Sequence, residues 1–369
     1  MKLSRRNFLV RGGAAAGLVC GGVVVRLSGR LVARAPVRLG LVGVGGIGRI
    51  NLERFLDRHD VEVRAICETH AGRAEAARDR VAARAGGRDI CDLTEDYREL
   101  CGRADIDAVV VAVPDRLHAA VALAAIAAGK AVYAEPPFAH TLKQGRELLR
   151  AVARSGCVWQ TGAHLRGEPA FRCAVAAVRG GRIGRVARIE VGLPGGGRGP
   201  VEWTDSEGGL YHWRWMSAYG GGSLAEWIGH YGDIALWGAG KVAELPVSVV
   251  GQGEYPRDGI FDTATSFRFR CNYRDGVEIE VADGGRLEKG IGVRWLGENG
   301  EWIWVTRGAV EASDRRLLTG LPLAALRPVD LRREFVEAVK GHRATCVPAV
   351  AAFHAAALGQ LGDRAMRRA

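Results

Sequence analysis

The stretch VRLGLVGVGGIG, from Val37 to Gly48, decides the fold of this chain. Its apolar first half predicts a buried parallel strand, and its glycines follow with the spacing G-x-G-x-x-G. Glycine lets the backbone turn tightly and approach a pyrophosphate, which would lie on the amide groups of a helix beginning near Ile47. The stretch therefore predicts a dinucleotide site. Its predicted cofactor-binding residues are Gly43, Gly45, Gly46, Ile47 and Gly48.

A second apolar run, VEVRAIC over residues 61–67, strengthens this prediction, because Glu68 follows it twenty residues after Gly48. A carboxylate at that distance accepts hydrogen bonds from the ribose hydroxyls of NAD and repels the 2′-phosphate of NADP. Arg73 follows closely, so NADP is the less favoured cofactor rather than an excluded one. An ordinary strand, turn and helix with a surface glutamate is the alternative interpretation.

Composition and charge narrow the class of protein. The chain has 369 residues, 48% of them hydrophobic and 25% charged, which is typical of a globular protein with two domains. Its formal net charge is +11, but seven of those charges lie in residues 1–35, which contain no acidic residue. The remainder carries about +4, with no long basic run, so we expect no nucleic-acid partner.

The first 35 residues have the pattern of a Tat signal peptide. Arg5 and Arg6 precede a mildly apolar stretch over residues 12–25, and Ala33-Arg34-Ala35 provides an A-x-A site. The apolar stretch is short for a membrane span, so we expect none after the signal is removed. The prediction is export to the periplasm or another extracytoplasmic compartment, and a basic tail is the alternative.

The pattern of elements predicts an α/β protein with two domains. Strands and helices alternate over residues 36–161, which predicts a Rossmann domain with its ligand at the carboxyl ends of the strands. Period-two alternation over residues 162–330, with Asp275-Gly276 and Asn299-Gly300 turns, predicts a C-terminal α+β domain with a large, mostly antiparallel open sheet. Residues 331–369 return to helical periodicity.

One predicted helix, over residues 224–237, carries the candidate acid/base chemistry. Glu226 and His230 are four residues apart and Asp233 follows at i+7, which places the three on one face of a regular α-helix. A carboxylate beside a histidine orients the ring and raises its pKa, which suits a base that takes the proton of an alcohol as hydride leaves carbon. A structural or solvated pair is the alternative. No spacing typical of metal ligands occurs, and no C-x-x-C motif is present.

These motifs together resemble the glucose-fructose oxidoreductase/inositol dehydrogenase family (Gfo/Idh/MocA), in particular its Tat-exported branch. The resemblance runs from Val37 to the end and rests on several segments in the family's order. They are residues 43–48, 114–118, 129–135, 180–184, 213–215 and 221–237. The resemblance implies NAD, a carbohydrate substrate such as a sugar, polyol or derivative, and a homo-oligomer, either dimer or tetramer.

The resemblance also implies roles for individual residues. His230 would be the general acid/base, and Glu226 would stand where the family usually has Asp. The implied cofactor contacts beyond the glycine turn are Glu68, Pro114, His118, Glu135, Trp213 and Arg214. The implied substrate contacts are His164, Arg166, Arg214, Tyr219, His230 and Asp233.

One departure from the family bears on function. The family's lysine after the glutamate of its E-K-P motif is Pro136 here, which has no charge and no donor. Lys130 begins the strand and should point to the opposite end of the sheet, while Lys143 in the next helix is a possible replacement. Three functions stay open: an oxidoreductase acting on a CH–OH group, an NAD-using glycosidase or epimerase with transient oxidation, and a catalytically impaired sugar-binding protein.

The tryptophans of residues 203–237 support a carbohydrate ligand, since flat aromatic faces stack on sugar rings. Filling the core is the alternative, and we favour it for Trp237. Arg307 and His354 match family positions, and we expect both to be structural.

Overall fold

The computed structural model describes residues 35–195, 213–341 and 344–369. Residues Pro36–Ala369 form one compact unit, and the predicted signal peptide before them, like Trp203, lies outside the described residues. Within these ranges, none of the helices has the length and apolar character needed to cross a membrane.

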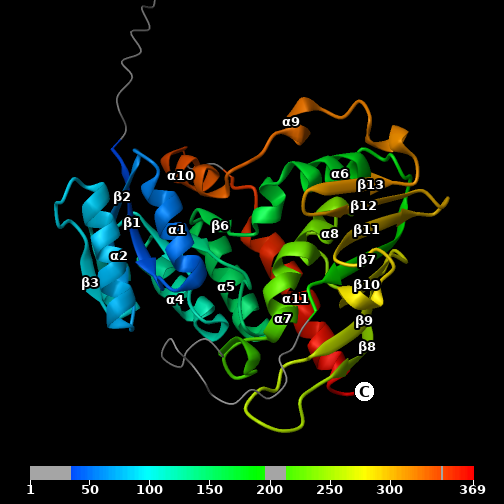
Figure 1. Cartoon of the computed structure of the whole chain (residues 1–369), viewed down its shortest axis with the longest axis horizontal. Coiled ribbons are helices and arrows are strands. Elements are labelled where there is room, and N and C mark those ends of the chain that lie inside the picture. The colour runs from blue at the N-terminus through cyan, green and yellow to red at the C-terminus, as the bar shows by residue number, and fades with distance from the viewer. Residues whose placement is uncertain (1–34, 196–212, 342–343) are drawn as a thin grey trace, which may run out of the picture. The chain divides into compact units, whose positions relative to one another are not determined.

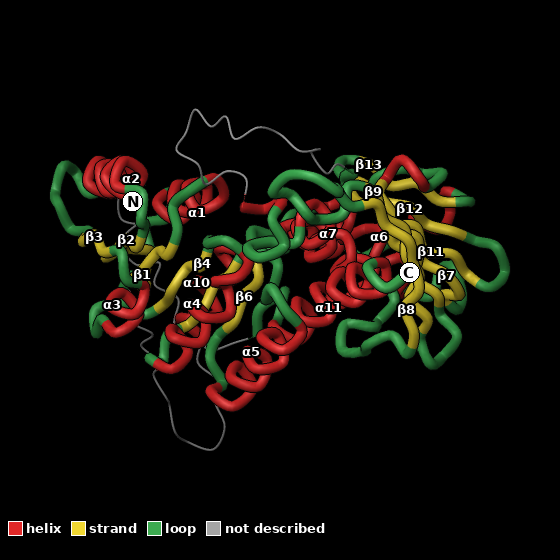
Figure 2. The backbone as a smooth tube through the Cα atoms, turned by 90° about the horizontal axis from the view of Figure 1, so that it is seen from below, coloured by secondary structure: helices red, strands yellow, loops and turns green. Residues whose placement is uncertain are grey.

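The N-terminal sheet is parallel throughout and has the strand order β3-β2-β1-β4-β5-β6 (Figures 1 and 2). Its strands are β1 (Val37–Val42), β2 (Val61–Cys67), β3 (Asp92–Thr94), β4 (Ala108–Val111), β5 (Ala131–Ala134) and β6 (Trp159–Thr161). The connecting helices are α1 (Gly46–Leu56), α2 (Ala71–Arg84), α3 (Tyr97–Gly102), α4 (Asp115–Ala127) and α5 (Leu142–Ser155). This is the predicted Rossmann arrangement, with the carboxyl ends of the strands at one edge.

The second sheet has seven strands in the order β13-β12-β11-β7-β10-β9-β8. They are β7 (Val186–Leu193), β8 (Ser248–Glu254), β9 (Ser266–Asn272), β10 (Glu278–Asp283), β11 (Gly292–Gly297), β12 (Trp302–Thr306) and β13 (Ala309–Ala312). Every neighbouring pair is antiparallel except β7 and β10. The two predicted hairpins are confirmed: β9 turns into β10 and β11 turns into β12, with Gly276 and Gly300 at positive φ. Strands β3, β8 and β13 were not predicted from the sequence.

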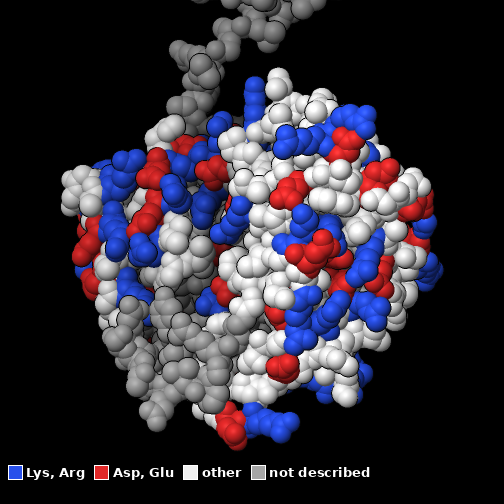
Figure 3. All heavy atoms as spheres, turned by 45° about the vertical axis from the view of Figure 1, so that its right-hand side comes forward, with Lys and Arg blue, Asp and Glu red and all other residues white. Residues whose placement is uncertain are grey.

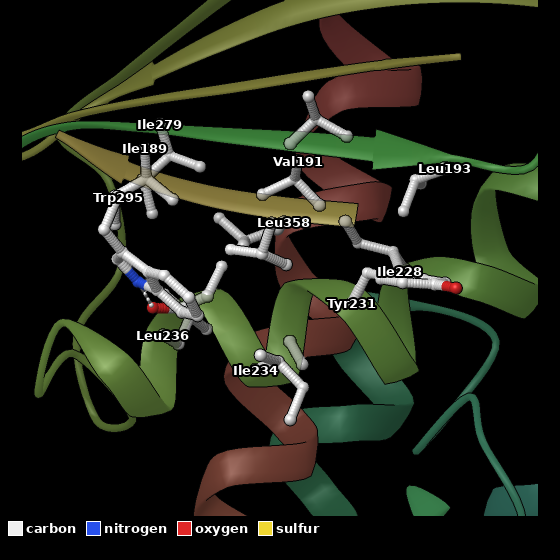
Figure 4. Packing of buried hydrophobic residues seen from close by; sticks show 14 of the residues in the cluster. Ile189, Val191, Leu193, Ile228, Tyr231, Ile234, Leu236, Ile279, Trp295 and Leu358 are labelled. Carbon is white, nitrogen blue, oxygen red and sulfur yellow. Dashed lines mark hydrogen bonds between the residues drawn. The ribbon is translucent and has the colours of Figure 1, made fainter. Parts of the chain in front are cut away.

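Helices cover one face of this second sheet and bury its apolar side chains. They are α6 (Pro169–Arg179), α7 (Gly222–Trp227), a π-helix over Ile228–Gly232 and α8 (Asp233–Gly238). In Figure 4, Ile189 and Val191 of β7 face Tyr231 and Leu236 of the helical stretch. The indole Nε1 of Trp295 donates to Ala235 O at 3.1 Å, which fixes α8 to the sheet.

The other face of the sheet carries paired charges. Glu280 of β10 is bonded to both Arg188 and Arg268 from the strands on either side, and Arg294 bonds Glu190 at 2.8 Å. Figure 3 shows acidic and basic side chains interspersed over the surface that it draws. The charges on that surface are therefore mixed in sign.

The C-terminal helices α10 (Leu331–Gly341) and α11 (Ala349–Met366) connect the two sheets. Phe335 of α10 packs in the Rossmann core, with its ring 6.5 Å from that of Phe55 and 5.7 Å from that of Tyr133. Helix α11 contacts α5 on one side and β8 on the other, and Figure 1 shows it ending beside β8. The last residues of the chain thus complete both halves of the fold. The remaining short helices are η2 (His164–Gly167), η3 (Trp213–Trp215), η5 (Gly284–Arg286), η6 (Arg315–Leu318) and α9 (Leu323–Leu326).

Candidate active site

The glycine turn leaves backbone exposed at the start of α1. Gly43 has φ +85°, and a Cβ there would lie 2.3 Å from Ala112 O, while a Cβ at Gly48 would lie 2.2 Å from Gly43 O. At Gly46, by contrast, a Cβ would meet nothing within 4 Å. No side chain caps the helix at Gly45, so the first amide groups of α1 are free to bind an anion. The turn fits the pyrophosphate of a dinucleotide.

Glu68 is held beside this turn by two backbone amides. Its carboxylate accepts from Val44 N and from His70 N, each at 3.0 Å. These bonds fix the carboxylate at the carboxyl end of β2, where an acid that binds ribose hydroxyls belongs. Arg73 also approaches the turn, because its guanidinium lies 3.7 Å from the position of a Cβ at Gly45. Glu68 and Arg73, which the sequence placed near each other, therefore both lie beside the glycine turn.

His118 joins the loops that follow β4 and β5. The ring is buried, and its Nδ1 and Nε2 lie 2.7 and 2.8 Å from the carbonyl oxygens of Pro137 and Val113. Burial lowers its pKa, although these backbone contacts act in the opposite direction. A neutral ring donates to one of these carbonyl oxygens and contacts the other, so His118 links the two loops of the cleft. Pro114 precedes α4 at its N-cap.

Glu135, at the end of β5, is buried and held by an amide rather than a cation. Asn51 Nδ2 donates to Glu135 Oε1 at 2.9 Å, and Arg332 of α10 donates in turn to Asn51 Oδ1 at 2.6 and 2.8 Å. Gly162 makes room for the carboxylate, since a Cβ there would lie 2.5 Å from Oε1. Burial raises the pKa of Glu135 to about 7, against the opposing effects of Asn51 and Arg332.

Pro136 stands in van der Waals contact with the segment that carries His230. A Cβ at Gly229 would lie only 2.7 Å from Pro136 Cβ, so these two residues fit because Gly229 has no side chain. Lys130 is bonded to Arg103 O and Ile106 O at the opposite edge of the sheet, as predicted. Lys143 is exposed at the start of α5. The contact between Pro136 and Gly229 brings His230 to the carboxyl edge of the Rossmann sheet.

The prediction that Glu226 pairs with His230 and raises its pKa is wrong. Residues 228–232 form a π-helix, so the register of a regular α-helix is lost between the two side chains. Glu226 pairs instead with Arg214, at 3.2 Å between Oε2 and Nε. Its pKa is raised by burial, although Arg214 acts in the opposite direction.

His230 lies among aromatic rings. Its ring centroid is 4.6 Å from that of His164 and 5.8 Å from that of Trp227, and its Nδ1 is buried with no hydrogen-bond partner among the described residues. Burial holds the pKa of His230 well below its usual value, with further lowering from His164 and Arg307. The sequence predicted a pKa raised by Glu226, so the direction is corrected. A neutral imidazole at neutral pH has a lone pair with which to accept a proton.

Arg166 and Asp233 bind each other. Arg166 Nε and Nη2 donate to the two carboxylate oxygens of Asp233, both at 2.6 Å, and Nη1 donates to Cys346 O at 2.8 Å. The side chains are 5% and 1% exposed, respectively. Both carboxylate oxygens of Asp233 and all three guanidinium nitrogens of Arg166 therefore have a partner within the protein. This arrangement indicates a structural role for the pair, which the resemblance had placed at the substrate.

The remaining predicted contacts lie on the segment before α7. Tyr219 packs under Arg116, whose guanidinium is 4.1 Å from the ring, and Tyr219 O accepts from Arg116 N. Trp213 and Arg214 form a short 3₁₀ helix and are partly buried. Trp237 packs against the core of the second sheet, as favoured, and His354 bonds Val350 O within α11.

A cavity of about 400 Å³ lies beside this site, where the β5–α5 loop and α7 meet α11. Asp115 and Pro137 belong to its described lining, while the glycine turn, Glu68 and His230 do not. Burial raises the pKa of Asp115 to about 6, and Gly221 N donates to this carboxylate at 3.2 Å. The cavity thus adjoins the candidate site, but His230 is not part of its lining. No cluster of side chains in the described ranges could hold a metal ion.

Sequence reasoning missed Asn51, Arg332 and the contact of Arg307 with His164. Arg307, in the turn between β12 and β13, places Nη2 against His164 Nε2. Arg332 reaches Asn51 from 281 residues away. No local spacing signals such contacts, because they depend on how α10 and the second sheet pack.

Comparisons with known proteins identify the first domain and the fold. Residues 37–163 match the family model described as an oxidoreductase family with an NAD-binding Rossmann fold, GFO_IDH_MocA. A glycosyl hydrolase family 109 protein of Shewanella baltica is 31% identical over 172 residues, which cover 42% of this chain and 38% of that relative. The chain therefore spans less than half the length of this curated relative.

Solved structures share the fold over nearly the whole chain. A putative myo-inositol dehydrogenase from Sinorhizobium meliloti has a TM-score of 0.66 at 21% identity, covering 90% of this chain and 98% of its own. The WlbA dehydrogenase of Bordetella pertussis, in complex with NADH and UDP-GlcNAcA, has a TM-score of 0.69 at 19% identity, covering 90% and 96%. The resemblance is confirmed for the first domain: residues 37–163 match the NAD-binding Rossmann fold of the Gfo/Idh/MocA oxidoreductase family, and the solved dehydrogenase structures share the fold of about nine tenths of the chain.

Proposed function

We propose that this protein is an NAD-dependent oxidoreductase that acts on a CH–OH group of a sugar, polyol or sugar derivative, with His230 as the acid/base. The observation that carries the proposal is the neutral, buried His230 at the carboxyl edge of an NAD-binding Rossmann sheet. The relatives named above support a carbohydrate substrate.

NAD, when bound, supplies the hydride acceptor or donor for this chemistry. The glycine turn and the amides of α1 would hold its pyrophosphate, and Glu68 would accept from its ribose hydroxyls. We propose NAD over NADP because the Glu68 carboxylate is fixed in place, with Arg73 as the nearby group that could accommodate a phosphate.

His230 would move the proton of the substrate hydroxyl. Burial keeps the ring neutral, so it has a lone pair for the proton at neutral pH. Glu226 would act on Arg214 rather than on His230, and the Glu226–Arg214 pair would shape the wall of the site. Pro136 has no donor with which to polarise the substrate oxygen as a lysine would. His230 would therefore have to interact with that oxygen without a neighbouring lysine.

A second candidate is a glycosidase or epimerase that oxidises its substrate transiently and returns the hydride. The glycosyl hydrolase name of the curated relative favours it, as does Pro136 in place of the family's lysine. In this case the redox state of bound cofactor would be unchanged after each turnover. A catalytically impaired sugar-binding protein is the third outcome.

The test begins with mass spectrometry and absorbance of ligand released from purified protein. A panel of sugars and polyols is then added while the absorbance of reduced nicotinamide is followed. The proposal expects bound or bindable nicotinamide whose redox state changes with one substrate class, and loss of that change in His230→Asn. His59→Asn, at an exposed histidine, is the matched control. Release of a glycosidic leaving group without net reduction would support the second candidate, and absence of any nicotinamide binding would reject both.

Location and assembly are further proposals. We propose Tat-dependent export on the strength of Arg5 and Arg6, tested by fractionation of cells that express the chain and its Arg5→Lys/Arg6→Lys variant. We propose a homo-oligomer built on the charged outer face of the second sheet, tested by light scattering of the purified protein with and without Arg268→Glu.

A further inference from the structure

Arg307 reaches the acid/base group from the far end of the second domain. It lies in the turn between β12 and β13, 143 residues from His164 in sequence, yet its Nη2 contacts His164 Nε2. A guanidinium has only donors and keeps its charge at all ordinary pH values. The contact is therefore a hydrogen bond only when His164 Nε2 is the acceptor, which requires the proton of the neutral ring to lie on Nδ1.

His164 transmits this constraint to His230. The two rings lie 4.6 Å apart at 59°, and Trp227 lies 5.8 Å from His230. Because His230 Nδ1 has no hydrogen-bond partner among the described residues, packing between these rings sets the orientation of the imidazole. Arg307 contacts both neighbours, since its guanidinium also lies 5.7 Å from the Trp227 ring.

We propose that Arg307 is a positioning residue for the acid/base His230: it fixes the Nδ1-protonated form of His164 and holds that ring and Trp227 against His230. Through this contact the protein places a cation beside the acid/base group from the second domain, whereas the family places its lysine at the position of Pro136. The inference rests on the proposed function for its consequence in turnover, but the contact and the tautomer belong to the protein without any ligand.

The surrounding charges agree with this assignment. Burial lowers the pKa of His164 to about 4, with further lowering from Arg307 and then Arg332. The titratable groups that face His164 are Arg307 from the β12–β13 turn, His230 from the π-helix and Arg332 from α10. Glu168 lies 3.8 Å from Arg307 Nε and holds the guanidinium from its other side.

The test is the nitrogen-15 spectrum of the histidine side chains, recorded from pH 4 to 9 without cofactor or substrate. His164→Gln and His230→Asn assign the two rings. The proposal expects His164 with Nε2 unprotonated across neutral pH and a titration midpoint near 4. In Arg307→Met the proton should redistribute toward Nε2, and the His164 midpoint should move upward, since a nearby cation has been removed.

Two variants separate charge, geometry and folding. Arg307→Lys keeps a cation that only donates hydrogen bonds, so it should keep both the lowered midpoint and the Nδ1-protonated form of His164. Arg316→Met removes an arginine that is 88% exposed and paired with Asp314, and should change neither ring. Unchanged His164 tautomer and midpoint in folded Arg307→Met would overturn the proposal. If Arg307→Met does not fold, the Arg307→Gln spectrum decides, because an amide oxygen can accept from a protonated Nε2: a His164 tautomer and midpoint identical to wild type would overturn the proposal.

Once a substrate is known, steady-state kinetics test the same proposal independently of the spectra. The proposal expects kcat to fall about tenfold or more in Arg307→Met with KM little changed, and Arg307→Lys to recover part of it. An active enzyme indifferent to Arg307→Met would overturn this inference and leave the proposed function standing. A protein that shows the tautomer change but no turnover with any substrate would support the positioning contact and reject the oxidoreductase.

Discussion

Two contacts link the same pair of segments and differ in what they leave unsatisfied. The segment after β6 supplies Arg166 and His164, and the stretch after α7 supplies Asp233 and His230. Arg166 and Asp233 are buried and bind each other through both carboxylate oxygens. His164 and His230, two and three residues away in the sequence, meet through their rings, and His230 Nδ1 has no hydrogen-bond partner among the described residues. The first contact fixes the geometry that the second needs for chemistry.

The difference shows how to distinguish a structural pair, such as Arg166 and Asp233, from side chains that can bind a ligand. A buried pair whose charged groups bind each other stabilises the fold, while a buried polar atom without a partner is still able to bind a ligand. Polar residue type alone does not distinguish the two, since the sequence pattern had placed all four residues at the substrate.

The largest loss of stability is expected from breaking the Arg166–Asp233 ion pair. Asp233→Asn leaves the buried Arg166 guanidinium without its counter-charge, so the free energy of unfolding should fall by about 3–5 kcal/mol. Urea denaturation followed by tryptophan fluorescence measures it. Arg166→Met/Asp233→Asn together should be less destabilising than Asp233→Asn alone, since no charge is then stranded. A loss of stability below about 1 kcal/mol for Asp233→Asn would contradict the structural role of the Arg166–Asp233 pair.

Glu135 extends the comparison to a carboxylate paired with an amide. Burial raises its pKa to about 7, so the folded protein holds a proton that the unfolded chain has lost above about pH 4.5. The free energy of unfolding should therefore fall as pH rises from about 4.5 to about 7, on the order of 3 kcal/mol, and then level off. Glu135→Gln should remove this component. Parallel pH profiles for the two proteins would show that Glu135 titrates normally.

Gly229 tests packing rather than pairing. A Cβ there would lie 2.7 Å from Pro136 Cβ, so Gly229→Ala should reduce the free energy of unfolding by about 1–3 kcal/mol. Gly102→Ala, at a helical glycine where a Cβ meets nothing within 4 Å, is the control and should be neutral or slightly stabilising. Pro136→Gly should recover part of the Gly229→Ala loss, and strict additivity of the two would mean that they do not touch.

The smallest effect on stability should come from His230 itself. His230→Asn loses ring packing against His164 and Trp227 but breaks no hydrogen bond of Nδ1 among the described residues, so the free energy of unfolding should fall by about 1 kcal/mol. Nicotinamide-linked turnover should nevertheless be lost. Thermal unfolding measures the stability and the sugar assay measures turnover. A loss of stability comparable with that of Asp233→Asn would show that His230 has a structural role.

The sequence predicts the fold well where the pattern is local. The apolar run into Gly43 and Gly48, the Asp275-Gly276 and Asn299-Gly300 turns and the period-two strands all correspond to elements of the structure. The missed strands are short or weakly patterned: β3 has three residues, β13 has four, and β8 contains two glycines. Such segments become strands because a neighbour pairs with them.

The site was predicted less completely, for two physical reasons. The spacing of Glu226 and His230 implies a shared face only in a regular α-helix, and the π-helix over Ile228–Gly232 removes that register. The contacts of Arg332 and Arg307 join segments far apart in the chain, and spacing contains no information about them. The prediction that Glu226 raises the pKa of His230 was wrong because the partners of both side chains depend on tertiary packing.

The position of α10 and α11 has a consequence for the order in which the protein can be made. Phe335 of α10 fills the core between Phe55 and Tyr133, and α11 packs on α5 as well as on β8. The domain that leaves the ribosome first therefore cannot close its core until the last residues have been synthesised. A chain released early should remain protease-sensitive along its whole length, and a translocation pathway that accepts folded proteins would have to wait for the C-terminus.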